Sequence, residues 1–361
     1  MRKPMMKRPL LITCGAVLLL ALAAYLLRVP LIMALVAPLA AHRLATDTAA
    51  ELPDGLHVGL CGSGSPFPDE GRGGPCTLVL AGKRLFVFDA GNMSTRNIGK
   101  MGFQHGQIEA LFLTHFHSDH IDGLGELLLQ RWVAGSNRAP LPVVGPAGVE
   151  QIVSGLAQVY RQDQGYRVAH HGDATVPRSG FGGQAMPFTP AADGRVVVLK
   201  DTDLEISAFV VDHTPVHPAV GYRIRYKDRS VVLSGDTKQS AAVQREAAGV
   251  DLLVHEALSE PLLAVLRKAA ADQGRTHLEK IFLDIADYHA TPEQAAATAR
   301  DAKVRYLLLN HIVPPLPLPG MEAAFLADAP KIFPGPLRVG RDGDLLSLPT
   351  GTTSITLREM F

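Results

Sequence analysis

From position 56 onward, short apolar runs of strand length alternate with turns rich in glycine and proline. Runs of helical period are interspersed with them, at residues 123–133, 149–160, 261–271, 277–287 and 291–302, so the pattern predicts a mixed α/β domain. The stretch 161–195 lacks a clear period. We expect it to be irregular, with short strands, and to cover the substrate.

Several predicted strands end directly at a residue that can bind a metal ion. These residues are Asp89, His115, His213, Asp236, His255 and His311. Active sites of layered α/β folds collect where strand ends meet loops. A single such residue is usually a capping or hydrogen-bonding group, but this repeated placement predicts one shared site.

The first 50 residues follow a different pattern. Four basic residues precede an uncharged apolar run, residues 9–27, which approaches the roughly 20 residues that a membrane-spanning helix needs. The basic flank predicts a cytoplasmic N-terminus and an exported body. A cleaved signal peptide is the alternative, but a second apolar stretch favours an inner-membrane anchor and linker (1–50), with a periplasmic domain (51–361).

Residues that can bind a metal ion are most concentrated in the run T-H-F-H-S-D-H, from Thr114 to His120. Imidazole and carboxylate are ligands that zinc accepts. His115 and His117, two positions apart, can face one ion, while Asp119 and His120 can turn to a second. The run therefore predicts two adjacent metal sites rather than a polar loop with chance histidines.

Composition adds little to this picture. The 35 Lys and Arg residues balance the 35 Asp and Glu residues, so net charge gives no reason to expect an acidic partner. Three cysteines are too few for a disulfide scaffold. Cys61 and Cys76 could form a bridge in an oxidising compartment, but we expect two buried thiols.

The ordered motifs resemble those of the metallo-β-lactamase superfamily, and within it the ribonuclease Z and metallo-arylsulfatase branch. They are the loop from Thr114 to His120, then Asp212-His213, Ser234-Gly235-Asp236-Thr237, His255-Glu256-Ala257, His289-Ala290-Thr291 and Asn310-His311. The resemblance spans roughly residues 56–349. It implies a four-layer αββα sandwich with a dizinc site between the sheets. The N-terminal transmembrane helix predicted above is a departure from the ribonuclease Z pattern.

The resemblance also assigns roles to residues. It implies that His115, His117 and His213 hold the first zinc, that Asp119, His120 and His311 hold the second, and that Asp236 bridges both. A hydroxide that bridges the metals would be the nucleophile. Asp119 thus belongs to the catalytic centre. Asp89, His255 and Glu256 are expected to hydrogen-bond around the ligands.

His289 is the implied general acid. In the ribonuclease Z branch, a histidine of this motif protonates the leaving group, which esters with poor leaving groups require. A surface histidine at a helix N-terminus is the alternative. Because no lysine occurs between Lys100 and Lys200, the chain offers little charge of the kind that grips RNA phosphates. We therefore expect a small phosphodiester or sulfate ester as substrate, with nucleic acid as an unlikely partner.

Other interpretations stay open. A ribonuclease Z-like RNA endonuclease, or a lactonase or other acyl hydrolase, could use the same site. A tethered binding module without activity is disfavoured, because all seven predicted ligands are present. Manganese or iron could replace zinc, since imidazole and carboxylate do not fix the metal. The sequence does not give the oligomeric state, and a dimer stays open.

Overall fold

The computed structural model describes residues 7–361, and side chains from residue 12 onward. The chain divides into two compact units, residues up to Asp47 and Thr48–Phe361. The first unit contains helix α1 (Lys7–Ala45). Its segment Ile12–Ala45 is long and apolar enough to cross a membrane, by length and composition.

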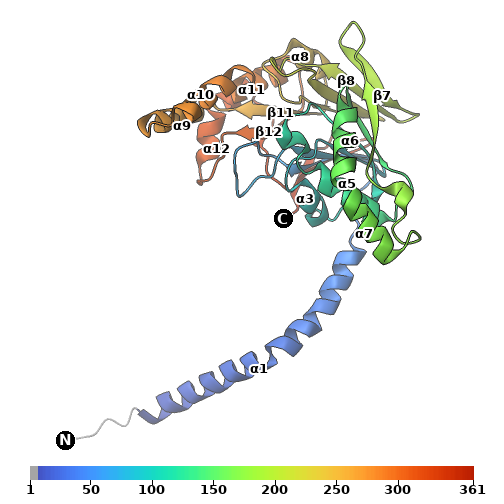
Figure 1. The fold of residues 1–361 in the computed structure, drawn as a ribbon. Helices are drawn as coiled ribbons and strands as arrows, with labels where there is room; N and C mark the ends of the chain where they lie inside the picture. Colours follow the sequence, from blue (N-terminus) through green and yellow to red (C-terminus); the bar gives the residue numbers. More distant parts are fainter. Residues whose placement is uncertain (1–6) are drawn as a thin grey trace, which may run out of the picture. The chain divides into compact units, whose positions relative to one another are not determined.

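The second unit contains two sheets (Figure 1). The strands of the first sheet are β1 (Gly55–Gly62), β2 (Cys76–Ala81), β3 (Arg84–Phe88), β4 (Ile108–Phe112), β5 (Leu141–Pro146), β6 (Gly183–Phe188), β14 (Asp344–Pro349) and β15 (Thr356–Glu359). Their order is β15-β14-β1-β2-β3-β4-β5-β6. The neighbours β3, β4, β5 and β6 run parallel, so their carboxyl ends meet at one edge.

The second sheet has seven strands. They are β7 (Arg195–Lys200), β8 (Leu204–Val210), β9 (Val220–Tyr226), β10 (Arg229–Leu233), β11 (Leu252–Leu258), β12 (Tyr306–Val313) and β13 (Leu337–Val339). Their order is β13-β12-β11-β10-β9-β8-β7. Here β10 to β13 run parallel, which again gathers their carboxyl ends.

Helices cover the outer faces of both sheets (Figure 1). The α-helices of the second unit are α2 (Thr48–Glu51), α3 (Ser94–Lys100), α4 (Ser118–Ile121), α5 (Leu124–Gly135), α6 (Val149–Val159), α7 (Arg161–His171), α8 (Ala241–Glu246), α9 (Glu260–Asp272), α10 (Thr276–Asp284), α11 (Pro292–Asp301), α12 (Met321–Leu326) and α13 (Ala329–Ile332). Short 3₁₀ turns are η1 (His105–Gln107), η2 (Arg178–Gly180) and η3 (Ile285–Asp287).

Three apolar cores correspond to the interfaces between these layers. One joins the two sheets, one lies between the first sheet and α3, α5 and α6, and one lies between the second sheet and α8, α11 and α13. Between the sheets, the rings of Phe88 and Phe112 stack with centroids 4.8 Å apart, and Tyr222 meets Phe88 edge-on at 5.1 Å. The predicted four-layer αββα sandwich is therefore confirmed.

Two local predictions are wrong. Residues Arg161–His171 form helix α7, not irregular chain. Nearby, Trp132, Val168 and Val176 form a small buried cluster that holds this weakly amphipathic segment against the body. Cys61 and Cys76 are not free thiols but a disulfide, since adjacent strands place their Cα atoms 5.0 Å apart.

Candidate metal site

The predicted ligands come together where the parallel strands of the two sheets end. His115 follows β4 and Asp236 follows β10, while His311 lies near the end of β12. His213 follows β8, which runs in the same direction as β10 because both pair antiparallel with β9. The direction of the strands thus explains why residues far apart in the sequence meet.

The loop after β4 is held at its start by the second sheet. The hydroxyl of Tyr222 donates to the carbonyl oxygen of Leu113 at 2.6 Å, and Val220 N donates to the carbonyl oxygen of Thr114 at 3.0 Å. Both donors lie on or beside β9 of the second sheet. The opposite sheet therefore fixes the starting point of the histidine-rich loop.

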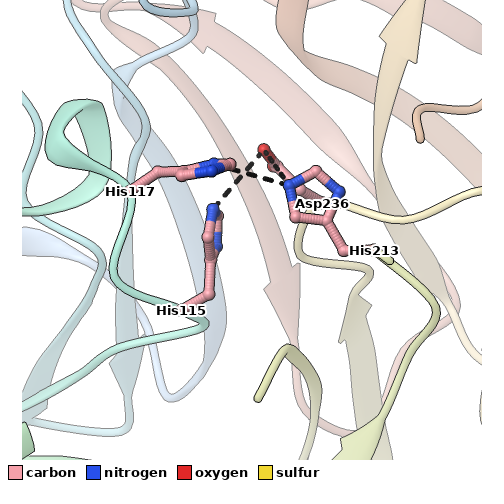
Figure 2. Close-up of side chains that lie close together, drawn as sticks. All are labelled: His115, His117, His213 and Asp236. Atoms are coloured by element: carbon pink, nitrogen blue, oxygen red, sulfur yellow. Dashed lines mark hydrogen bonds and ion pairs between the residues drawn. The ribbon is translucent and has the colours of Figure 1, made fainter. Parts of the chain in front are cut away.

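Four side chains form a first metal group (Figure 2): His115, His117, His213 and Asp236. His115 Nε2 and His213 Nε2 each lie 3.9 Å from Asp236 Oδ2. His213 Nε2 lies 3.5 Å from His117 Nδ1. His117 thus presents Nδ1, whereas His115 and His213 present Nε2, and the three imidazoles face one point.

Asp119, His120 and His311 form a second metal group. His311 Nε2 lies 3.3 Å from Asp119 Oδ2, and His120 Nε2 lies 3.6 Å from the same oxygen. Asp236 Oδ2 lies 3.3 Å from His120 Nε2 and 3.1 Å from His311 Nε2. One carboxylate oxygen therefore lies beside both groups, as a bridging ligand would.

The backbone at His311 is specialised for this placement. Glu256 of β11 pairs with Asn310 and Ala257 pairs with Ile312, so His311 is the extra residue of a bulge. Its φ angle is 45°, in the left-handed region that non-glycine residues rarely adopt. Bulges redirect side chains at active sites, and this one turns the imidazole toward Asp119 and Asp236.

The electrostatics of His115 and Asp236 match a metal site. Burial and the imidazole of His120 hold the pKa of His115 well below its usual value. Burial disfavours the carboxylate of Asp236, but the imidazoles of His311 and His120 outweigh it and hold the pKa of Asp236 well below its usual value. A neutral imidazole and an ionised carboxylate are the protonation states that bind metal. Burial lowers the pKa of His120 and His311, but the carboxylate of Asp236 outweighs burial and raises the pKa of both, so these two imidazoles must lose a proton when a metal binds.

Unpaired nitrogen atoms point to the same conclusion. Among the described residues, the buried Nε2 atoms of His115 and His120 have no hydrogen-bond partner. Buried polar atoms are almost always paired, so these two require a ligand that the chain does not supply. The donor set suits a divalent cation that accepts nitrogen and oxygen, and the residues fit the metal that the sequence predicts.

Neighbouring groups fix the orientation of the ligands. Asp89 accepts hydrogen bonds from Thr114 N at 2.9 Å, Thr114 Oγ1 at 2.8 Å and His120 Nδ1 at 2.9 Å. His213 Nδ1 donates to the carbonyl oxygen of Tyr288 at 2.9 Å. In both cases the proton on Nδ1 leaves Nε2 free to face a metal. Asp89 thus lies beside His120, and its role as an orienting group stays a prediction.

His289 lies directly beside the two groups. Its Nδ1 is 3.2 Å from Glu256 Oε1, and its ring stacks on that of His311 with centroids 5.3 Å apart. Burial lowers the pKa of His289 to about 4. Glu256 Oε1 also accepts from Thr237 N at 3.2 Å and Ala290 N at 2.9 Å. Glu256 therefore links the His289 loop to the loop that carries Asp236.

One predicted neighbour is not brought to the site. His255 is buried within β11, where its Nδ1 donates to the carbonyl oxygen of Glu256 at 2.7 Å. Two other groups that hydrogen-bond around the ligands, the Thr114 hydroxyl and the Tyr288 carbonyl, were not predicted from the sequence. The hydroxyl residue directly before the histidine loop was a usable signal for Thr114. A backbone carbonyl leaves no signal in the sequence.

Comparison with known proteins agrees with this geometry. Residues 69–276 match the metallo-beta-lactamase superfamily. A ribonuclease Z of Mycolicibacterium gilvum is 38% identical over 289 residues, which are 80% of this chain and 94% of the relative. The crystal structure of human tRNase Z, short form, has 20% identity and a TM-score of 0.57, and the match covers 81% of this chain and 99% of that chain.

The chain belongs to the metallo-beta-lactamase superfamily, and its own histidine and aspartate groups could hold metal ions. Within that superfamily it is similar to proteins named ribonuclease Z. A second such relative, from Mycobacterium avium, is 36% identical over 80% of this chain and 96% of its own length. The recognition made from the sequence motifs is thus confirmed.

The prediction about the partner is wrong. A small ester and no nucleic acid were expected, whereas the curated relatives are ribonucleases by name. That prediction rested on the absence of lysine between Lys100 and Lys200. That stretch carries six arginines instead, namely Arg131, Arg138, Arg161, Arg167, Arg178 and Arg195. Arginine binds phosphate at least as well as lysine does, and often in bidentate fashion.

Proposed function

We propose that this chain is a zinc-dependent phosphodiesterase that cleaves RNA, as its ribonuclease Z relatives do by name. The observation that carries the proposal is the position of His289, buried against His311 and Glu256 at the edge of both metal groups. A phosphodiester of RNA expels an alkoxide, which requires a proton donor. The relatives described above are ribonucleases by name, which does not favour the alternative, an arylsulfatase-like activity on small esters.

The ligand assignment is part of the same proposal. His115, His117 and His213 would hold one zinc ion, Asp119, His120 and His311 a second, and Asp236 both. When bound, the two cations would polarise a phosphoryl oxygen and lower the pKa of bound water toward neutrality. Asp236 and Asp119 would offset the repulsion between the cations, because each contributes a negative charge beside them.

His289 would act on the leaving oxygen. Its Nδ1 faces Glu256, so its Nε2 is the atom available to hold a proton toward the substrate. Glu256 would position this ring rather than contact the substrate, since it is fully buried and its Oε1 accepts two backbone N–H groups. Burial raises the pKa of Glu256 well above its usual value, which favours a neutral, hydrogen-bonding carboxyl.

A panel of substrates tests the proposal. Full-length, zinc-loaded protein in detergent would be given a transfer RNA transcript with single-stranded extensions, bis(4-nitrophenyl) phosphate, 4-nitrophenyl sulfate and a lactone. We expect cleavage of the RNA and of the phosphodiester, with the sulfate and lactone left intact. Turnover of the sulfate or the lactone alone would contradict the proposal and the role of His289.

We further propose that residues 1–50 are an anchor and linker, and that the domain 51–361 lies outside the cytoplasm. Two independent observations support this: the apolar helix α1 with its basic start, and the Cys61–Cys76 disulfide. Disulfides persist in oxidising compartments and are rare in the cytosol. The orientation follows from the positive charges before the apolar run.

Thiol labelling in bacterial cells tests this location. Cells that express the full chain would be quenched in acid, denatured and alkylated, and compared with cells that express residues 48–361. We expect only Cys14 to be labelled in the full chain, and both Cys61 and Cys76 to be labelled in the shorter one, which stays in the reducing cytosol. Labelling of Cys61 and Cys76 in the full chain would contradict an extracytoplasmic domain.

A further inference from the structure

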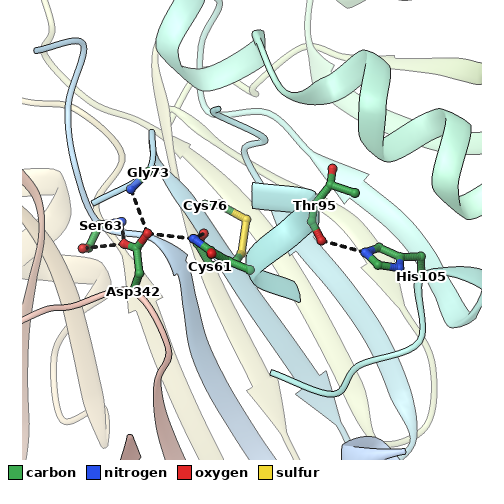
Figure 3. The surroundings of a disulfide bond; sticks show 8 residues. Cys61, Ser63, Gly73, Cys76, Thr95, His105 and Asp342 are labelled. Atoms are coloured by element: carbon green, nitrogen blue, oxygen red, sulfur yellow. Dashed lines mark hydrogen bonds between the residues drawn. A yellow bond between two sulfur atoms is a disulfide. The ribbon is translucent and has the colours of Figure 1, made fainter. Parts of the chain in front are cut away.

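The disulfide closes a loop that reaches the metal groups. Cys61 and Cys76 are both buried, and they join β1 and β2 where the two strands separate (Figure 3). Between them the chain makes a glycine-rich loop, residues 62–75, whose ends hydrogen-bond to each other through Gly64 N and the Gly73 carbonyl oxygen at 2.8 Å. The bridge therefore fixes the base of this loop.

The loop contacts the backbone at the second metal group. The Ser63 carbonyl oxygen accepts from the N–H of Ile312, the residue after His311, at 2.9 Å. Gly74 lies against Asp119, such that an added Cβ would meet the Asp119 carbonyl oxygen at 2.9 Å. One end of the loop thus supports His311 and the other supports Asp119.

His120 is supported through one intermediate segment. The Pro75 carbonyl oxygen accepts from Gly91 N at 3.0 Å, and the neighbouring Ala90 N donates to the carbonyl oxygen of His120 at 2.8 Å. By contrast, in the described part of the chain the loop makes no hydrogen bond to His115, His117 or His213. The support is therefore directed to the second group.

Asp342 holds the loop from the opposite side (Figure 3). Its carboxylate accepts from Ser63 N and Ser63 Oγ, each at 2.8 Å, and from Gly73 N and Asn97 Nδ2, each at 2.7 Å. Asn97 Nδ2 also donates to the Cys61 carbonyl oxygen at 3.0 Å. One half-buried carboxylate thus holds together both ends of the loop, helix α3 and the segment that carries the disulfide.

We propose that Asp342 and the Cys61–Cys76 disulfide are positioning elements that hold the loop against Asp119, His120 and His311, and so retain the second metal ion. This inference rests on the proposed two-zinc site. Neither element touches a metal ligand's side chain; they act through the backbone. Groups that orient metal ligands typically change metal affinity about 10- to 100-fold when they are removed, which sets the expected size of the effect.

Zinc alone is the probe for the test. Full-length protein in detergent would be prepared as wild type, as Asp342→Asn, and as the double variant Cys61→Ser, Cys76→Ser. Asparagine keeps the volume of Asp342 but turns an N–H₂ group toward N–H donors that need an acceptor. The control is Cys14→Ser, which removes the free, exposed cysteine of α1. Zinc per chain and the two dissociation constants would be measured by competition with a chromophoric chelator.

We expect one of the two zinc ions to bind about 10- to 100-fold more weakly in Asp342→Asn and in the double cysteine variant, with the other unchanged. The control should match wild type. Equal weakening of both ions, or unchanged zinc binding with only a lower unfolding temperature, would overturn the inference. If the double variant does not fold, Asp342→Asn decides the question with the disulfide intact. Wild type that binds fewer than two zinc ions would instead refute the proposed two-zinc site.

Discussion

Asp236→Asn is expected to abolish activity and to release metal, because this side chain is shared by both metal groups. Its Oδ2 lies within 3.9 Å of four imidazole nitrogens, those of His115, His120, His213 and His311. Asparagine keeps the shape but removes the negative charge that would offset two cations. We expect kcat/KM to fall by more than about 1,000-fold, or ~4 kcal/mol of transition-state stabilisation.

Metal analysis of the purified variant accompanies the rate measurement. We expect less than half of the wild-type zinc content, since the bridging ligand contributes to both groups. Asp272→Asn is the matched control, because this exposed carboxylate of α9 pairs with Lys268 one helical turn away. An Asp236→Asn protein that keeps two zinc ions and wild-type activity would contradict the bridging role.

His289→Ala is expected to slow RNA cleavage by about 100- to 10,000-fold, the usual contribution of general acid catalysis. The cleavage rate of 4-nitrophenol esters should fall much less, because that leaving group departs without a proton. The measurement is kcat/KM for RNA and for bis(4-nitrophenyl) phosphate with the same variant. The difference between the two losses reports protonation of the leaving group.

Zinc content separates this role from an alternative one. A ring nitrogen of His289 also lies within 4.8 Å of ligand atoms of Asp236 and His311, so the imidazole could bind metal instead. We expect His289→Ala to keep both zinc ions, and His170→Ala, on the exposed end of α7, to match wild type. Equal losses for both substrates, together with lost zinc, would show that His289 is a ligand.

The fold and the metal groups were readable from the sequence because strand direction organises them. A predicted strand that ends in His115, Asp236 or His311 gives little information alone. In a parallel sheet, however, the carboxyl ends share one edge, so such residues must converge. The side chains that meet in the two groups are the seven predicted ligands. Their individual roles stay predictions.

Other parts depend on tertiary contacts that leave no local pattern. Asp342 lies in a turn that is far along the sequence from the loop it holds. Nothing in the residues before and after it distinguishes it from a solvated carboxylate. Prediction of the disulfide would have required the register of β1 and β2, which places Gly62 opposite Cys76. The His311 bulge likewise arises from pairing with β11. Each follows from strand register, which apolar runs alone do not specify.

The substrate was misjudged for a different reason. Charge composition describes solubility and non-specific attraction, not the chemistry of a site. The absence of lysine between Lys100 and Lys200 concerned one residue type in one segment. The relatives that are named ribonuclease Z overturn that prediction, and charge composition gave no sign of it.

The most direct test of the central claim is cleavage of a transfer RNA transcript by the full-length protein before and after removal of zinc. We expect phosphodiester cleavage by the zinc-loaded protein, loss of cleavage after chelation and recovery when zinc is returned. Recovery should be absent in Asp236→Asn. RNA that stays intact with protein carrying two zinc ions per chain, or cleavage that persists after the zinc is removed, would contradict the account.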